Sequence, residues 1–159
     1  MLDFKFLKIQ YMKLRGAVIK FLDRFNESSY YYRPTLKSNT TAWIIPHISA
    51  FEQLMVVDKI IGYNFSEFIS QENIDKYKPN VDGFKFKKEE MMSIEQAIEL
   101  LKRTQEVSVK FLDEMIAQND SAKEVDPETA FNRYLLNFSH ETEHYGQIKY
   151  LIGTWQRTQ

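Results

Sequence analysis

The sequence contains no cysteine. This absence excludes disulfide bonds, thiolate metal ligands and a protein thiol that acts as a nucleophile. Any chemistry that requires a thiol must therefore use a thiol carried by a small molecule.

Proline and glycine are also scarce, with four and five residues respectively in a chain of 159. The long segments between them carry apolar residues at three- and four-residue spacing, which is typical of amphipathic helices, and no segment shows the alternation of a strand. A chain of this length with 43% hydrophobic residues buries roughly 70% of its unfolded surface, enough for one core. The sequence predicts an all-α protein with a single domain over residues 1–159.

The sequence has neither an excess of one charge nor a long hydrophobic run. A formal net charge of -1 offers no concentrated positive surface for nucleic acid. The longest uncharged window, residues 38–51, is too short to cross a bilayer, and the N-terminus MLDFKFLK lacks the apolar centre of a signal peptide. We therefore expect a cytoplasmic protein that acts on a small molecule, with no nucleic-acid or membrane partner.

Capping patterns place the helix boundaries. The hydroxyl of Thr40 or Thr41 can cap the start of the second helix, and Gly62 is a natural stop for it. The segment Ser93-Ile94-Glu95-Gln96 has the form of a capping box, and Asp126-Pro127-Glu128 combines a capping side chain with proline at the first helical position. These signals predict four long helices, over residues 3–26, 41–62, 93 onward and 126–155, with a short helix near 66–74.

The long connection over residues 63–92 decides the predicted topology, because it allows the second and third helices to run parallel to each other. The sequence therefore predicts a four-helix bundle of up-down-down-up topology, with the long connection between helices 2 and 3.

The stretch HETEHYGQ, residues 140–147, holds two of the only three histidines in the chain. At about 100° per residue, His140 and His144 differ by about 40° and lie on one helix face together with Leu136 and Ile148. The third histidine, His47, lies on an apolar face of the second helix together with Trp43 and Phe51. All three imidazoles are predicted to point inward.

Two interpretations of these histidines stay open at this point. A lone histidine on an apolar face is usually a core residue whose ring nitrogens find a carbonyl or a hydroxyl. Two desolvated imidazoles one turn apart need either several partners or one shared cation. Because the whole histidine inventory lies on inward faces of two helices, it matches the three nitrogen ligands of an open metal site.

The segments RPTLKSNTTAWIIPHISAFEQ and NFSHETEHYGQIKYLIG give the chain a resemblance to the DinB-like superfamily, over essentially its whole length. The second segment is similar to the family's His-x-x-x-His followed by Gly-Gln, although Tyr145 stands where many members have a further histidine. The resemblance implies an up-down-down-up bundle with a metal ion on three histidines, here His47, His140 and His144. The superfamily includes thiol-dependent transferases and isomerases that use bacillithiol or mycothiol, and it also includes many members of no known activity. The resemblance therefore implies a thiol-dependent reaction of this kind.

Three functions follow as hypotheses. Three imidazoles would leave a divalent ion, zinc or nickel, with an exchangeable position that takes a thiol or a water molecule. We expect a bacillithiol-type S-transferase that acts on small electrophiles with an imported low-molecular-weight thiol. A metal-dependent hydrolase and a non-enzymatic metal-binding stress-response module are the alternatives. Dimerisation is common in the superfamily, so a homodimer is also expected.

Further residues are candidates around the ion. A ligating histidine usually donates its other N–H to an oxygen, which makes side chains near the histidines candidate supports: Glu52, Asn137, Glu143 and Gln147. Solvent exposure is the competing interpretation for Glu143, and an ordinary helix-to-helix hydrogen bond for Gln147. Tyr31, Arg33 and Trp43 are candidates for the wall of a substrate mouth, with the guanidinium offered to an anionic group. Aromatic loop residues that simply cover the core are the alternative.

Overall fold

A computed structural model describes residues 2–159, and within that range the secondary structure is entirely helical. The all-α prediction is confirmed, with two short helices in addition to the four long ones. The α-helices are α1 (Phe4–Leu22), α2 (Glu27–Tyr30), α3 (Thr41–Met55), α4 (Gln71–Tyr77), α5 (Ile94–Ala117) and α6 (Pro127–Gln156). Short 3-10 turns occupy Val57–Lys59, Gly83–Lys85, Lys88–Glu90 and Asp120–Ala122.

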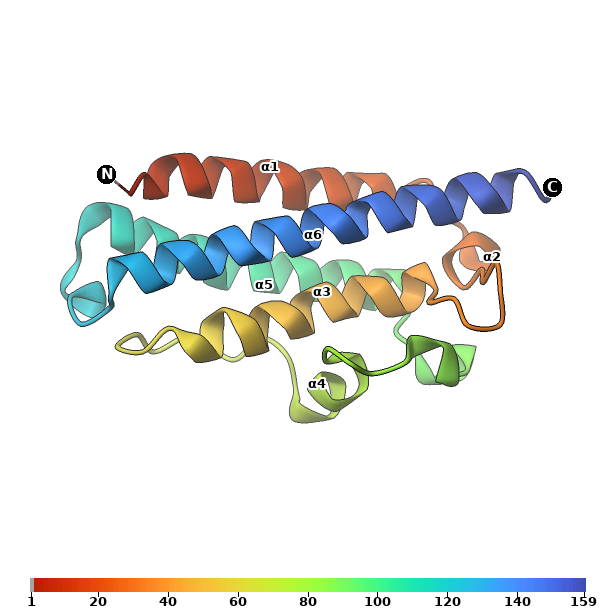
Figure 1. Ribbon diagram of the computed structural model, residues 1–159, viewed down its shortest axis with the longest axis horizontal. Coiled ribbons are helices and arrows are strands. Elements are labelled where there is room, and N and C mark those ends of the chain that lie inside the picture. The colour runs from red at the N-terminus through yellow and green to blue at the C-terminus, as the bar shows by residue number, and fades with distance from the viewer. Residues whose placement is uncertain (1) are drawn as a thin grey trace.

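The four long helices lie side by side (Figure 1). In that view α1 and α6 run in one direction, whereas α3 and α5 run in the opposite direction. The short helix α4 lies outside α3, and α2 lies near the C-terminal end of α6. No helix within residues 2–159 is long and apolar enough to span a membrane.

The predicted helix starts are confirmed by their capping contacts. The Thr40 hydroxyl accepts a hydrogen bond from the backbone N–H of Trp43 at 3.2 Å, and this contact opens α3. Ser93 and Gln96 form the reciprocal capping box of α5, and Asp126 caps α6. Each cap satisfies backbone N–H groups that have no partner inside the helix.

Three predicted helix boundaries are wrong: the end of the first helix, the start of the short helix and the end of the second long helix. The first helix ends at Leu22 instead of residue 26, since Asn26 caps α2. The short helix begins after Ser70, its cap, and not near residue 66. The second long helix ends at Met55 and not at Gly62. Gly62 has a φ of 89°, and an added Cβ would lie 2.5 Å from the carbonyl oxygen of Glu124.

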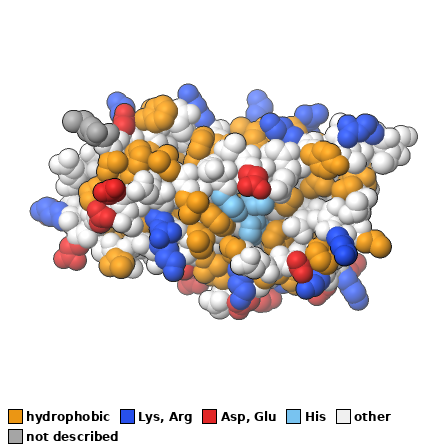
Figure 2. Space-filling view, viewed as in Figure 1, with side chains coloured by type: hydrophobic (Ala, Val, Ile, Leu, Met, Phe, Trp, Pro, Cys, Tyr) orange, Lys and Arg blue, Asp and Glu red, His pale blue; other side chains and the backbone are white. Residues whose placement is uncertain are grey.

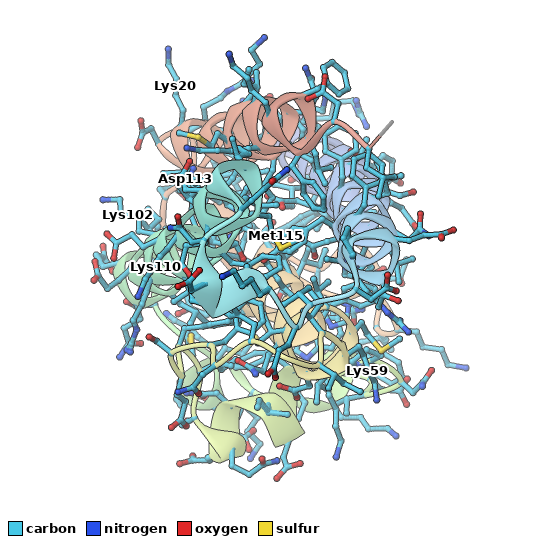
Figure 3. All side chains as sticks on the ribbon, turned by 90° about the vertical axis from the view of Figure 1, so that its left-hand side faces the viewer. Lys20, Lys59, Lys102, Lys110, Asp113 and Met115 are labelled. Carbon is cyan, nitrogen blue, oxygen red and sulfur yellow. The ribbon has the colours of Figure 1, made fainter. Side chains whose placement is uncertain are left out.

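A polar layer divides the apolar core into two parts. On α1, Tyr11 belongs to one apolar cluster and Val18 to the other, and Arg15 lies between them. Side chains of the other helices continue this layer, all fully buried: Glu52 on α3, Thr104 and Ser108 on α5, and Asn137 and Glu141 on α6. In the end-on view of Figure 3, Met115 lies among the helices and is buried, whereas Lys20 and Lys102 are exposed and point away from the helices.

Candidate metal centre

Two helices bring the three histidines together, with His47 on α3 and the pair His140 and His144 on α6. The Nε2 atom of His140 lies 3.2 Å from Nε2 of His47 and 3.0 Å from Nε2 of His144. One ring nitrogen from each of the three residues lies within 4.8 Å of the others. The structure therefore unites residues that are 93 positions apart in the sequence.

The cluster lies at the surface of the α3–α6 contact, and the histidine side chains are visible near the middle of the face shown in Figure 2. His47 is only 6% exposed, whereas His140 and His144 are half-buried. Leu136, expected to point inward with them, is 41% exposed. The inward prediction therefore needs a correction, because this face of α6 reaches the edge of the helix contact instead of the centre of the bundle.

The tautomer of His47 follows from its second nitrogen. Nδ1 lies 2.6 Å from the backbone carbonyl oxygen of Tyr77, at the end of α4. A carbonyl oxygen can only accept, so Nδ1 carries the proton and donates it. In the neutral ring, Nε2 is therefore a bare lone pair that faces the other two histidines.

A chain of side-chain contacts fixes the tautomer of His144 in the same way. Its Nδ1 lies 2.9 Å from Oε1 of Gln147. The amide nitrogen of Gln147 donates to the carboxylate of Glu143 at 3.4 Å, which fixes the orientation of the amide. The amide oxygen must then accept from Nδ1–H of His144, so Nε2 of this ring is also bare.

The ring of His140 lies between these two lone pairs. It stacks on Phe51, with ring centroids 3.5 Å apart, and its Nδ1 is buried without a hydrogen-bond partner. If Nε2 of His140 carries a proton, that proton serves only one of the two neighbouring lone pairs. If it carries none, three lone pairs face one another. A cation between the three rings would satisfy all of them.

Burial keeps these imidazoles neutral, as metal ligands must be. Desolvation lowers the pKa of His47 to about 4. Desolvation, followed by the charges of His144 and His47, lowers the pKa of His140 to about 3. The pKa of His144 is also lowered, again chiefly by burial.

Two of the three spacings between the histidine nitrogens fit bonds to one shared divalent metal ion. Two imidazole nitrogens bonded to one tetrahedral ion at about 2.0–2.1 Å lie about 3.3 Å from each other. The observed Nε2–Nε2 separations of 3.0 and 3.2 Å are close to that value. The donor set, three neutral imidazoles, suits a divalent transition-metal ion.

The predicted supporting residues divide into two groups. Gln147 contacts a histidine directly and Glu143 does so through Gln147. The prediction for Glu52 needs a correction, since its carboxylate accepts hydrogen bonds from Tyr11 and Arg15 in the bundle interior instead of from a histidine. Asn137 is fully buried, and its amide group has no hydrogen-bond partner.

Only one of the three residues expected at a substrate mouth lies beside the histidines. Trp43 stacks on His47, with ring centroids 4.5 Å apart, and its indole N–H donates to the carbonyl of Lys76. Arg33 donates to the carbonyls of Phe84 and Phe86, and Tyr31 donates to that of Met92. Tyr31 and Arg33 hold the 84–92 segment and do not contact the histidines.

Two contacts of the centre could not be predicted from the sequence. The stacking of Phe51 on His140 joins two helices, and helical phase alone cannot show which residues meet across them. The carbonyl of Tyr77 is a backbone group, and backbone carbonyls have no residue signature. The short helix predicted in the 63–92 connection is the only hint that this segment has a fixed structure.

An all-α protein with three histidines that face one another across two helices is a candidate metal-binding protein. The family comparison agrees with this class: residues 10–148 match the model of the DinB superfamily, so the chain belongs to that superfamily. No curated protein and no solved structure matches the chain.

Proposed function

We propose that this protein binds a divalent metal ion, zinc or nickel, through Nε2 of His47, His140 and His144. The observation that carries the proposal is the convergence of three ring nitrogens, two of which have a tautomer fixed by contacts on the far side of the ring. Such partners usually orient a ligating histidine and raise its basicity. Membership of the DinB superfamily supports the same conclusion.

We further propose a metal-dependent S-transferase that joins a bacillithiol-type thiol to a small electrophile. Three histidine ligands would leave a coordination position open, and an ion held by His47, His140 and His144 would supply Lewis acidity to a bound thiol or water molecule. The chain has no cysteine, so the thiol is a separate substrate. In the reaction the sulfur bonds to the electrophilic carbon, the thiol proton passes to solvent, and the leaving group departs with the bonding electron pair.

The residues of the chain supply the setting for this reaction. Trp43 and Phe51 place aromatic rings against His47 and His140, which fixes the planes of the two imidazoles. Gln147 and Glu143 hold the His144 ring from the solvent side. The ligand nitrogens thus stay in one arrangement while the open side remains accessible to a substrate.

A metal-dependent hydrolase is the second candidate. The exposure of the cluster on the molecular face favours it (Figure 2), because a metal site that opens to solvent has water available as a nucleophile. A hydrolase and a thiol transferase would share the same three ligands and differ only in the second substrate.

The direction of the long helices supports a further structural proposal. We interpret α1, α3, α5 and α6 as the four members of an up-down-down-up bundle (Figure 1). The segment between α3 and α5, which includes α4, is then the long connection of this topology. Its Tyr77 carbonyl contacts His47, so the connection belongs to the proposed metal centre.

Elemental analysis of the purified protein tests metal binding. We expect one zinc or nickel ion per chain after loading, and loss of that ion in His47→Ala and in His140→Ala. Tyr150→Ala is a matched control on α6, since this side chain is 61% exposed and should leave the metal content unchanged. A wild-type protein that refuses both metals would contradict the proposal.

A reaction with monochlorobimane distinguishes the activities. The transferase predicts metal-dependent loss of the electrophile only when a small thiol such as bacillithiol or glutathione is present. The hydrolase predicts turnover of ester or amide substrates without a thiol. A metal-loaded protein that is inactive in both assays would support a metal-binding module without enzymatic activity.

A further inference from the structure

Arg15 contacts each of the other three long helices. Its side chain is fully buried, and its Nε donates to Oε1 of Glu141 on α6 at 2.7 Å. Nη2 donates to Oε2 of Glu52 on α3 at 2.7 Å and to Oε2 of Glu141 at 3.0 Å. Nη1 donates to the backbone carbonyl of Leu101 on α5 at 3.2 Å. One guanidinium from α1 therefore connects α3, α5 and α6.

The two carboxylates in this cluster are neighbours of metal-centre residues. Glu52 follows Phe51 on α3, and Glu141 follows His140 on α6. Phe51 and His140 stack on each other at 3.5 Å, while their neighbours share the guanidinium. The ionic cluster and the metal centre are thus two sides of one contact between α3 and α6.

Stability alone does not explain a buried ion cluster. Desolvation of three charges opposes folding, and well-packed apolar side chains often replace such clusters with neutral or favourable effects. Directional hydrogen bonds offer something that apolar packing lacks. A planar guanidinium with fixed donor directions sets both the rotation and the axial position of the helices that it joins.

The metal centre needs this kind of control. Its ligands come from two helices, and metal–nitrogen bonds tolerate deviations of only about 0.2 Å. A small slide of α3 along α6 would move His47 away from His140 and His144. Apolar side chains repack after such slides more readily than a bidentate ion pair does.

We propose that Arg15 is a positioning residue of the metal centre, which holds α3 and α6 at the register where the three histidine Nε2 atoms converge. This inference rests on the proposed metal binding. Arg15 acts through Glu52 and Glu141 and has no contact with the ligand nitrogens themselves.

A charge-free cluster tests the inference without leaving a lone buried charge. The triple variant Arg15→Met, Glu52→Gln and Glu141→Gln keeps the side chains near their original size. We expect a helical, cooperatively unfolding protein whose zinc affinity, measured by competition with a chromophoric chelator, is weaker by about 10- to 100-fold. We also expect a changed visible absorption spectrum with cobalt as the probe.

A second measurement needs no metal. Long-range proton–nitrogen NMR spectra of the metal-free protein report the tautomer of each imidazole. Wild type should show Nδ1–H for His47 and for His144, as their contacts require. In the triple variant the signals of His47 should move toward the values of a tautomer mixture, because the ring no longer has a fixed position.

Two further variants complete the design. Arg15→Lys keeps the charge but not the planar fork, so we expect a folded protein with a smaller loss of zinc affinity; this variant decides the matter if the triple variant does not fold. Thr104→Val alters the same polar layer, where this residue bonds to Ser49 and Leu100, without touching Arg15. It should leave zinc affinity and the histidine spectra unchanged.

The outcomes separate the two proposals. If wild type binds zinc and a folded triple variant binds it equally well with unchanged histidine spectra, the positioning role of Arg15 is overturned and metal binding stands. If wild type binds none of zinc, nickel and cobalt, the proposed function fails, and the positioning role fails with it.

Discussion

Two clusters of ionisable side chains lie next to each other between α3 and α6, and they differ in how their polar atoms are satisfied. In the ionic cluster, Arg15 donates to two carboxylates and a carbonyl, and Glu52 also accepts from Tyr11 and Ser108. In the histidine cluster, the outer nitrogens of two rings have partners, whereas the inner Nε2 atoms face one another.

This difference indicates different roles. A buried polar group without a partner lowers stability, so native structures rarely keep one that has no function. The polar atoms of the ionic cluster are satisfied within the protein, and this cluster needs no ligand. In the histidine cluster, a shared cation would satisfy the inner Nε2 atoms, and the cluster is exposed on the molecular face from which a cation could enter (Figure 2).

Removal of the guanidinium alone should have the largest effect. Arg15→Ala leaves two buried carboxylates without their counter-charge, and we expect a loss of about 3–5 kcal/mol in unfolding free energy, measured by urea denaturation. Lys13→Ala, an exposed position on the same helix, should change it by less than about 0.5 kcal/mol. Equal effects of the two variants would contradict the structural role of the ionic cluster.

The next largest effect should be the loss of stability of the metal-free protein in acid, which distinguishes the histidine cluster from the ionic cluster. The folded pKa of His47 is about 4, below the ordinary 6.5, so the unfolded chain takes up the proton first. The contribution of neutral His47 to the unfolding free energy is therefore fully present above pH 6.5. It is lost as the pH drops toward 4, by up to about 3 kcal/mol.

A comparison with His47→Gln isolates this contribution. The neighbouring His140 and His144 also have lowered pKa values, whereas burial raises the pKa of Glu141, which titrates in the opposite sense. Urea midpoints between pH 7 and pH 4 should fall less steeply for the variant than for wild type. Parallel curves would show that His47 is not held neutral by the fold.

The substitution Gly83→Ala should disturb the histidine cluster through Trp43. The Cβ of Gly83→Ala would lie 2.3 Å from Cγ of this indole, which stacks on His47, so the variant should lose about 1–3 kcal/mol of stability and bind zinc more weakly. Gly16→Ala is the matched control, because nothing lies within 4 Å of its added Cβ. Gly16→Ala lies at an exposed helical position and should raise the unfolding free energy by about 0.5–1 kcal/mol. Thermal unfolding compares the stabilities of the two variants.

The smallest effect should come from Gln147→Ala. It removes the acceptor of the His144 Nδ1 proton, but this acceptor is exposed and water can replace it. We expect zinc affinity to fall by about 10-fold or less, by chelator competition, with little change in unfolding free energy. A loss as large as that of His140→Ala would mean that Gln147 is itself a ligand.

Local signals in the sequence were sufficient for much of the fold. Capping side chains at Thr40, Ser93 and Asp126 act over three or four residues, so the starts of α3, α5 and α6 could be predicted. Helix ends were harder to predict, because the end of α3 at Met55 and the φ of Gly62 depend on contacts with distant segments.

The same division applies to the candidate site. The sequence by itself determined which residues can be ligands, since it has three histidines and no cysteine, and helical phase placed His140 beside His144. Only the tertiary structure decided that Glu52 joins Arg15, that Tyr77 supports His47 and that Tyr31 and Arg33 lie elsewhere. The reason is physical: helical periodicity fixes which side chains share a face, whereas the packing of separate helices fixes which faces meet.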